Sequence, residues 1–173
     1  AEVGIWNTLS TLDIENNKII LFYTHIETKE SIGNIVNLNE LDYGNTGLFI
    51  ENSRNQTIQN NIITNNSISI HFLNSFDLVV QENNISYFEK AIYSVNSSSV
   101  ILTNHYNQGS LCLEFIDSNF SLDNYDYFDC SSAYLYEKYH VKVNIVTDND
   151  QPSLNHQFYY YNNIDSAKIY STT

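Results

Sequence analysis

The chain repeats itself at an interval of 22 residues. The pair Asn52-Ser53 returns as Asn74-Ser75 and again as Asn96-Ser97. Apolar residues keep the same interval in three columns, which are Ile14/Val36/Ile58/Val80/Leu102, Ile19/Leu41/Ile63/Ile85 and Ile26/Leu48/Ile70/Ile92. A period of roughly 20–50 residues indicates a repeat architecture, in which each unit buries its apolar face against its neighbours.

Each unit has the residue pattern of short strands. Apolar and polar residues alternate, as in Leu48-Phe49-Ile50 and Ile70-His71-Phe72, and no helical periodicity persists. The chain has only five Gly and one Pro, so its corners require Asn and Asp, which tolerate left-handed backbone angles. We therefore predict an all-β fold, a right-handed parallel β-helix with about 22 residues per coil.

The repeat is regular over residues 1–120 and is lost afterwards. Residues 121–173 keep strand-like alternation and are rich in Tyr and Asp. Terminal repeats are commonly atypical because something must cover the open end of a solenoid. We predict irregular β coils or a C-terminal cap for residues 121–173, continuous with the same domain, and a small separate β module is the alternative.

One column of the repeat is polar and consists of Asn17, Asn39, Asn61 and Asn83. An Asn at an inward corner can donate its side-chain N–H to the oxygen of the next Asn and also satisfy backbone groups. We interpret the column as a structural ladder rather than a ligand site. Its next position reads Asn104-His105, which indicates either a slip of one residue or the end of the ladder.

The charge excludes some partners. The formal net charge is −13, which argues against nucleic acid and against anionic membrane surfaces. No apolar run approaches the roughly 20 residues that span a bilayer. The opening residues AEVGIW start directly on a strand-like pattern, as in a secreted chain after cleavage, although an excised domain would look the same.

Cysteines and sequons fit an extracellular location. Cys112 and Cys130 are 18 residues apart, which is near one repeat and would allow them to sit on adjacent coils. In an oxidising compartment they would form a disulfide, and two buried thiols are the alternative. In an extracellular protein the five Asn-x-Ser/Thr sequons are candidate glycosylation sites, at Asn55, Asn65, Asn84, Asn96 and Asn119.

Acidic clusters are the candidate metal ligands. Asp148 and Asp150 form one cluster, and Asp126 and Asp129 belong to another. Carboxylate oxygens suit Ca²⁺, so calcium is the one cofactor that the sequence suggests, and an acidic surface loop is the alternative. The five histidines do not follow the repeat, so we do not expect them to gather around a metal.

No catalytic signature stands out. A hydrolase needs converging carboxylates and a lyase needs a base, whereas Arg54 and Lys90 fall at unrelated repeat positions. We therefore predict a non-enzymatic protein. Tyr87, Phe88, Tyr93 and the run 159–161 are candidates for stacking on sugars, with packing inside the coils as the alternative.

The phrases NSRNQTIQNNIITNNS and NSFDLVVQENNIS resemble the parallel β-helix repeats of the NosD-like, pectin-lyase-like superfamily. The shared pattern is Asn-Ser, a short gap, Ile-x-x-Asn-x-Ile and a polar corner, and it covers about residues 4–118. The resemblance implies a β-helix and is closest to archaeal cell-surface proteins. The catalytic motifs of the lyases and polygalacturonases in this superfamily are not visible here.

We therefore expect an extracellular, structural protein that assembles with copies of itself into a filament or surface lattice. The open ends of a β-helix carry unpaired strand edges, which another copy can cover by end-to-end stacking or strand exchange. The donated segment would be Ala1 to Leu12 or the strand near Ile169. Alternatives are a carbohydrate-binding or polysaccharide-cleaving module, and a domain of a larger adhesin or surface-layer protein.

Overall fold

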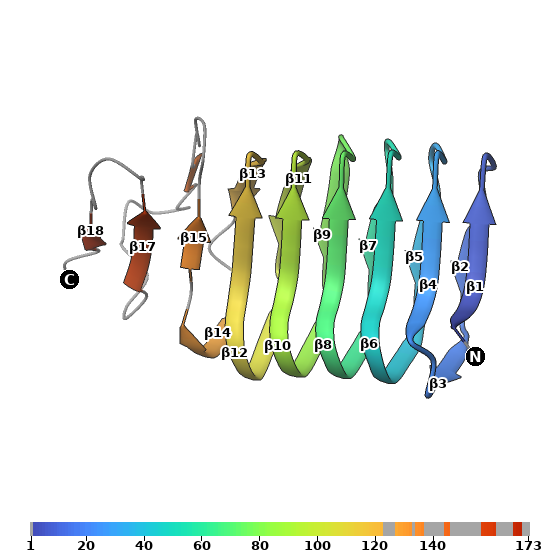
Figure 1. Cartoon of the computed structure of the whole chain (residues 1–173), viewed down its shortest axis with the longest axis horizontal. Coiled ribbons are helices and arrows are strands. Elements are labelled where there is room, and N and C mark those ends of the chain that lie inside the picture. Colours follow the sequence, from blue (N-terminus) through green and yellow to red (C-terminus); the bar gives the residue numbers. More distant parts are fainter. Residues whose placement is uncertain are drawn as a thin grey trace.

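The computed structural model describes residues 2–122 and the strand segments 127–132, 134–136, 144–145, 157–161 and 168–170. Strands from successive repeats stack in parallel into a β-solenoid, as predicted (Figure 1). Neighbouring strands along the regular part are related by steps of 21 or 22 residues. The 22-residue period of the sequence is therefore the length of one coil.

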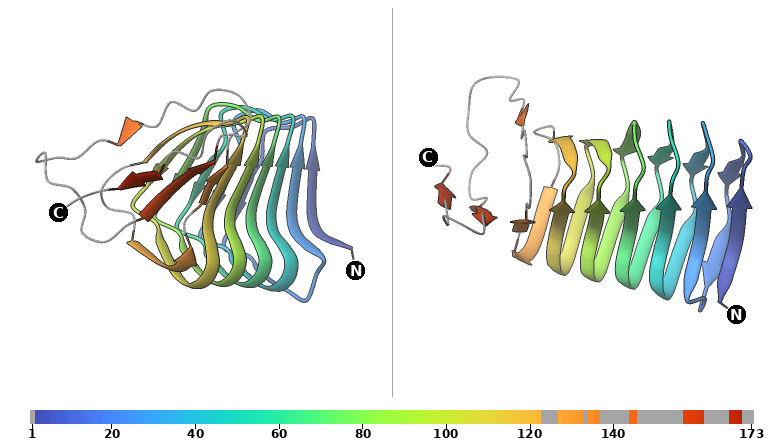
Figure 2. Two further views of the ribbon diagram at one scale, coloured as in Figure 1. Left: turned by 60° about the vertical axis from the view of Figure 1, so that its left-hand side comes forward. Right: turned by 45° about the horizontal axis from the view of Figure 1, so that its top comes forward.

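Two sheets run along the solenoid. The first has the order β1-β4-β6-β8-β10-β12-β14, and β3 also pairs with β6. Its members are β1 (Val3–Thr8), β3 (Lys18–Ile20), β4 (Thr24–Lys29), β6 (Glu40–Glu51), β8 (Ile62–Leu73), β10 (Asn84–Val95), β12 (His105–Ile116) and β14 (Tyr127–Ser132). The long strands curve round one side of each coil (Figure 2).

The second sheet has the order β16-β13-β11-β9-β7-β5-β2. Its members are β2 (Asp13–Glu15), β5 (Ile35–Asn37), β7 (Thr57–Gln59), β9 (Leu78–Gln81), β11 (Ser98–Leu102), β13 (Asn119–Leu122) and β16 (Asn144–Ile145). A short third side of the coils is held by single bridges that join Ile32, Arg54 and Phe76. A separate small sheet contains β15 (Tyr134–Tyr136), β17 (Gln157–Tyr161) and β18 (Lys168–Tyr170).

The apolar columns form the core between the sheets. Ile58, Val80, Ile63 and Ile70 are fully buried, as are their counterparts in neighbouring coils. One predicted member is wrong, because the repeat shortens by one residue between β9 and β11. Ile101, not Leu102, pairs with Val80 and is buried there.

The corners use left-handed backbone. In the described part of the chain, eighteen non-glycine residues have φ values near +50° to +65°, and they recur at nearly the repeat interval. Seven of them are Asn and two are Asp, as predicted, but Leu38, Tyr43 and Tyr87 take the same conformation. Residues other than Gly, Asn and Asp seldom adopt this conformation, which costs about 1–2 kcal/mol. The stacked register above and below each corner therefore imposes it.

The predicted Asn ladder lies at one of these corners. Oδ1 of Asn61 accepts the backbone N–H of Asn39 at 2.9 Å and its Nδ2–H at 3.1 Å. Asn61 donates in turn from Nδ2 to Oδ1 of Asn83 at 2.9 Å and to the carbonyl of Val36 at 2.9 Å. The slip of one residue does not end the ladder, because Asn104 accepts both corresponding bonds from Asn83 at 3.0 Å.

A second ladder, which we did not predict, consists of serines. The backbone N–H of Ser53 donates to Oγ of Ser75 at 3.1 Å, and that of Ser75 donates to Oγ of Ser97 at 3.0 Å. Ser31 and Ser118 extend the series at its two ends. In each Asn-Ser pair of the repeat, the Asn occupies the left-handed corner and the Ser is the buried member.

A disulfide joins Cys112 of β12 to Cys130 of β14, with the two Cα atoms 5.8 Å apart. Cys112 is fully buried. The bond links consecutive coils where the regular repeat ends. Separately, among the residues that the structure describes, no helix has the length and apolar character needed to cross a membrane.

The ladder predicts different costs for its interior and its end. Replacing Asn61 by Ala leaves the buried backbone N–H of Asn39 without its acceptor, whereas Nδ2 of Asn39 keeps the carbonyls of Ile14 and Asn37. We therefore expect a loss of about 3 kcal/mol in the free energy of unfolding. Asn17→Ala at the first rung strands no such donor and should cost about 1 kcal/mol. Denaturant titration of both variants measures this, and equal costs would contradict the ladder.

Candidate functional site

Exposed apolar side chains concentrate at the N-terminal end of the solenoid. Of the twelve large hydrophobic residues that are exposed in the described part of the chain, half lie between residues 6 and 23. Leu21 is 74% exposed, Leu9 73% and Trp6 69%, and the other three are Leu12, Ile20 and Tyr23. This concentration makes the N-terminal end of the described solenoid the candidate interaction surface.

The same end presents an unpaired strand edge. Within the described residues, β1 pairs only with β4. The N–H of Thr24 donates to the carbonyl of Glu2 at 2.9 Å. Because backbone groups in a strand point alternately to its two sides, the N–H and C=O groups of Val3 and Ile5 point away from β4. This edge is a template for a further strand.

The Asn ladder also ends here. Asn17 donates its backbone N–H and its Nδ2–H to Oδ1 of Asn39, both at 3.0 Å. Its Nδ2 also donates to the carbonyl of Glu15 at 3.0 Å. No group in the described residues donates to Oδ1 of Asn17, so this edge displays an acceptor where the interior coils have a bond. We define the N-terminal edge as residues 3–23, which contain β1, β2, β3, Asn17 and the exposed apolar residues named above.

A second arrangement lies on the outward face of the first sheet. Phe49, His71 and Tyr93 occupy equivalent positions in β6, β8 and β10, with 4.8 Å between successive ring centroids. The Lys29 ammonium lies 5.6 Å from the Phe49 centroid, and that of Lys90 lies 4.2 Å from the Tyr93 centroid. Both ends of this aromatic column are thus covered by a cation.

Carboxylates complete the aromatic column. Nζ of Lys29 is 2.9 Å from Glu27 and 3.0 Å from Glu51, and Nζ of Lys90 is 2.5 Å from Glu114. The hydrogen bonds that the Lys29 ammonium donates to the carboxylates of Glu27 and Glu51 raise the pKa of Lys29. Because its rings contact one another at tilted angles of 42° and 32° and its cations are paired with carboxylates, we interpret the column as stabilising the sheet surface.

Two histidines have a lowered pKa. Burial lowers the pKa of His71, the nearby Lys90 adds to this, and Glu51 opposes it. Burial also lowers the pKa of His25, against the opposing effects of the Asp42 carbonyl and carboxylate. Nε2 of the fully buried His25 lies 2.9 Å from the Asp42 carbonyl oxygen, to which it donates.

The candidate metal ligands do not come together in the described residues. Asp129 lies exposed on β14, whereas Asp126, Asp148 and Asp150 are outside the part of the chain that the structure describes. Among the described residues, no three His, Cys, Asp or Glu side chains are close enough to hold a metal ion. Calcium binding therefore stays a prediction.

The sequons differ in accessibility. The side chains of Asn55, Asn84, Asn96 and Asn119 are exposed. Asn65 is half-buried, and its Nδ2 donates to Oδ1 of Asp42 at 2.8 Å. Nδ2 of Asn96 donates to Oδ1 of Asn74 at 2.9 Å. Asn55, Asn84 and Asn119 are thus the most accessible of the five acceptors.

The predicted sugar-stacking residues have separate locations. Phe88 is only 5% exposed and its ring fills the space above Gly109, so packing inside the coils, the alternative to sugar stacking, is confirmed for this residue. Tyr93 belongs to the aromatic column, and the side chains of residues 159–161 on β17 lie outside the described part. Tyr87 is 56% exposed beside a shallow hollow of about 390 Å³.

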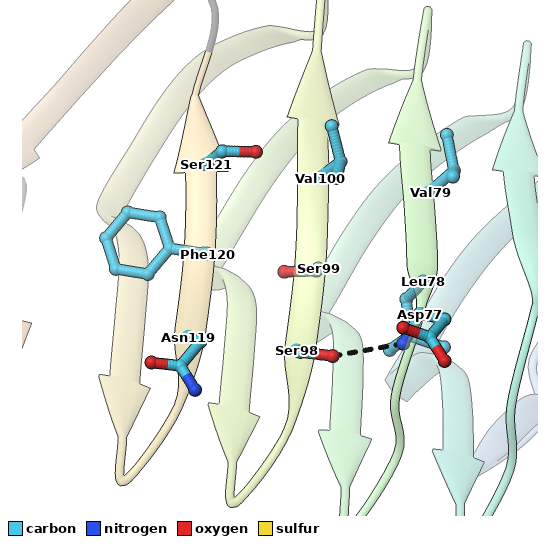
Figure 3. Close-up of a pocket in the computed structure, with 9 residues that line it drawn as sticks. All are labelled: Asp77, Leu78, Val79, Ser98, Ser99, Val100, Asn119, Phe120 and Ser121. Carbon is cyan, nitrogen blue, oxygen red and sulfur yellow. Dashed lines mark hydrogen bonds between the residues drawn. The ribbon is translucent and has the colours of Figure 1, made fainter. Parts of the chain in front are cut away.

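A larger hollow of about 450 Å³ lies on the second sheet and spans β9, β11 and β13 (Figure 3). Its lining is mainly apolar, and Asp77 is its one charged residue. The Ser98 hydroxyl accepts the backbone N–H of Asp77 at 3.0 Å. The lining of the hollow contains no acid–base pair.

The two cations considered for a lyase lie on different sides of the coil. The Arg54 guanidinium is on the short third side, 5.7 Å from the Phe76 ring, whereas Lys90 is on β10 of the first sheet.

We compared the chain with known protein families, curated proteins and solved structures. No protein-family model, no curated protein and no solved structure matches the chain. The N-terminal edge is therefore the candidate site on structural grounds alone.

The histidines predict that acid destabilises the fold. Below the ordinary pKa of 6.5 the unfolded chain binds protons that the folded His25 and His71 resist. Stability should be fully present above about pH 7 and fall between about pH 6.5 and 5. His71→Phe keeps a ring in the column and should show a smaller fall. Urea titrations at pH 7.5 and 5 measure this, and an identical fall in both proteins would exclude His71 as a contributor.

Proposed function

We propose that the protein is a non-enzymatic, extracellular structural subunit of a cell surface or filament, which assembles with copies of itself through the ends of its solenoid. The observation that carries this proposal is the N-terminal edge, where an unpaired strand coincides with exposed apolar side chains. Leaving such an edge open costs hydration of apolar surface and invites pairing with another chain.

The shape of the solenoid favours open-ended assembly. Its coils keep nearly the same length, so a second copy stacked on β1 would continue the sheets in the same register. Contact between two different ends of a molecule is heterologous, and such contacts generate filaments when they do not close into a ring. The backbone edge would supply affinity and the exposed apolar residues would add burial.

Several features support an extracellular location. The Cys112–Cys130 disulfide is typical of oxidising compartments, and three sequons are freely accessible. The net charge of −13 keeps separate rods soluble. Kinship with the archaeal surface members of the pectin-lyase-like superfamily is part of the same proposal.

Substitutions at Val3 test the edge. Val3→Pro removes a backbone N–H that points away from β4, so the monomer should fold while assembly is lost. Val3→Ala shortens the side chain but keeps that N–H, and it should still assemble. Electron microscopy and light scattering, over a range of salt and Ca²⁺ concentrations, measure assembly. Strictly monomeric wild-type protein under all conditions would overturn the proposal.

Carbohydrate binding is the second candidate. Tyr43 and Tyr87 occupy equivalent left-handed positions two coils apart, and both are more than half exposed. Holding tyrosines there is costly, and strained exposed residues often serve function. If they stack on sugars, glycan-array binding should occur and should be abolished by Tyr87→Ala and by Tyr43→Ala. Binding that survives both changes would exclude this tyrosine pair.

A further inference from the structure

We infer that the N-terminal edge accepts a β-solenoid coil only in the parallel, head-to-tail direction, and that the docking coil must carry an Asn at the corner that meets Asn17. This inference rests on the proposed self-assembly and specifies its partner. Its basis is that both buried ladders have one direction, which makes the two ends of the solenoid chemically different.

All rungs of the Asn ladder run the same way. Asn39 donates to Asn61, Asn61 to Asn83 and Asn83 to Asn104, always from the earlier coil to the later one. The serine ladder has the same direction, because the N–H of Ser31 donates to Oγ of Ser53 at 3.2 Å. The side-chain oxygens of both ladders therefore accept from the coil before them, whereas the Asn side chains also donate to backbone carbonyls of the coil before, as Asn61 does to Val36.

The first coil consequently presents acceptors. Oδ1 of Asn17 receives no donor within the described residues, although its counterpart in Asn39 receives two. A partner that satisfies Asn17 must bring an N–H and an Nδ2–H to the same corner. Only an Asn followed by a strand parallel to β3, and preceded by one parallel to β2, places both groups there.

A two-fold arrangement of two N-terminal edges fails this requirement. In that arrangement β1 would meet its copy antiparallel, and the two Asn17 corners would not bring the ladder's N–H donors to each other's Oδ1. An unsatisfied polar group that becomes buried costs about 1–3 kcal/mol, which is about five- to 150-fold in affinity. The ladders thus favour the direction that continues the solenoid.

One coil of the same chain carries the required chemistry. Residues 46–64 contain the second half of β6, all of β7, Asn61 and the first residues of β8. Within the solenoid, this segment lies beneath the next coil and Asn61 donates its backbone N–H and Nδ2–H to Asn83. Placed beneath the N-terminal edge, it would pair with β1 and β2 and bring Asn61 to Asn17.

The test uses a fluorescent peptide of residues 46–64 and the full chain, with binding followed by anisotropy. We expect saturable binding that Asn61→Ala in the peptide weakens about tenfold or more, because the peptide loses its side-chain donor. Asn17→Leu in the protein should weaken binding to a similar degree. Asn17→Asp keeps an acceptor oxygen and should bind within about threefold of the wild type. Thermal melting checks that both protein variants fold.

The control peptide has the same residues in reverse order, and it should not bind. Equal binding of the reversed peptide, indifference to both Asn17→Leu and Asn61→Ala, or no binding of the 46–64 peptide would each overturn the directional rule. Filaments that form while the peptide shows no such pattern leave the structural role standing and remove the rule. If the peptide shows the expected pattern but the protein stays strictly monomeric, the directional rule stands and the proposed structural role is removed.

Discussion

The fold depends on satisfying backbone N–H groups at corners that have no room for water. Each coil turns from the second sheet into the first at a buried position, and the amide there cannot reach solvent. Oδ1 of Asn61 accepts such an N–H from the coil before it, and the backbone N–H and Nδ2–H of Asn61 donate to the Asn of the coil after it. The serines solve the same problem at another corner. Because a lost acceptor strands a buried donor, these short polar side chains fix the register as firmly as the apolar columns do.

The ladders also connect the fold with the proposed role. A hydrogen-bonded column that runs in one direction has unlike ends, and the N-terminal end combines an acceptor at Asn17, the outward backbone groups of β1 and exposed apolar residues such as Leu9 and Leu21. The aromatic column on the first sheet is different in kind, because Lys29 and Lys90 already cover its ends. We propose that the open groups at the N-terminal end serve assembly, whereas the paired groups of the aromatic column stabilise the sheet.

The fold was predictable because the residues that repeat every 22 positions in the sequence are the ones buried in the core. The Asn and apolar columns follow from spacing alone, but the choice between a slip and an end at Asn104 needed the register of the neighbouring strands. Sequence could not tell which member of an Asn-Ser pair is buried, because both can satisfy a corner. Sequence could not decide between stacking and packing for Phe88, because the space for its ring comes from Gly109 in the next coil. The column through Phe49 follows the repeat and could have been found by aligning positions 49, 71 and 93, but its lysine caps come from other columns.

Hydrogen exchange tests most directly whether subunits assemble through the outward edge of β1. The amides of β1 are followed at increasing protein concentration. We predict that Val3 and Ile5, which point away from β4, exchange rapidly in dilute protein and become protected as subunits associate. The amides of Gly4 and Trp6, which face β4, provide the internal reference and should be protected throughout. Exchange of Val3 and Ile5 that is equally fast at all concentrations, while larger particles form, would show that assembly does not use this edge.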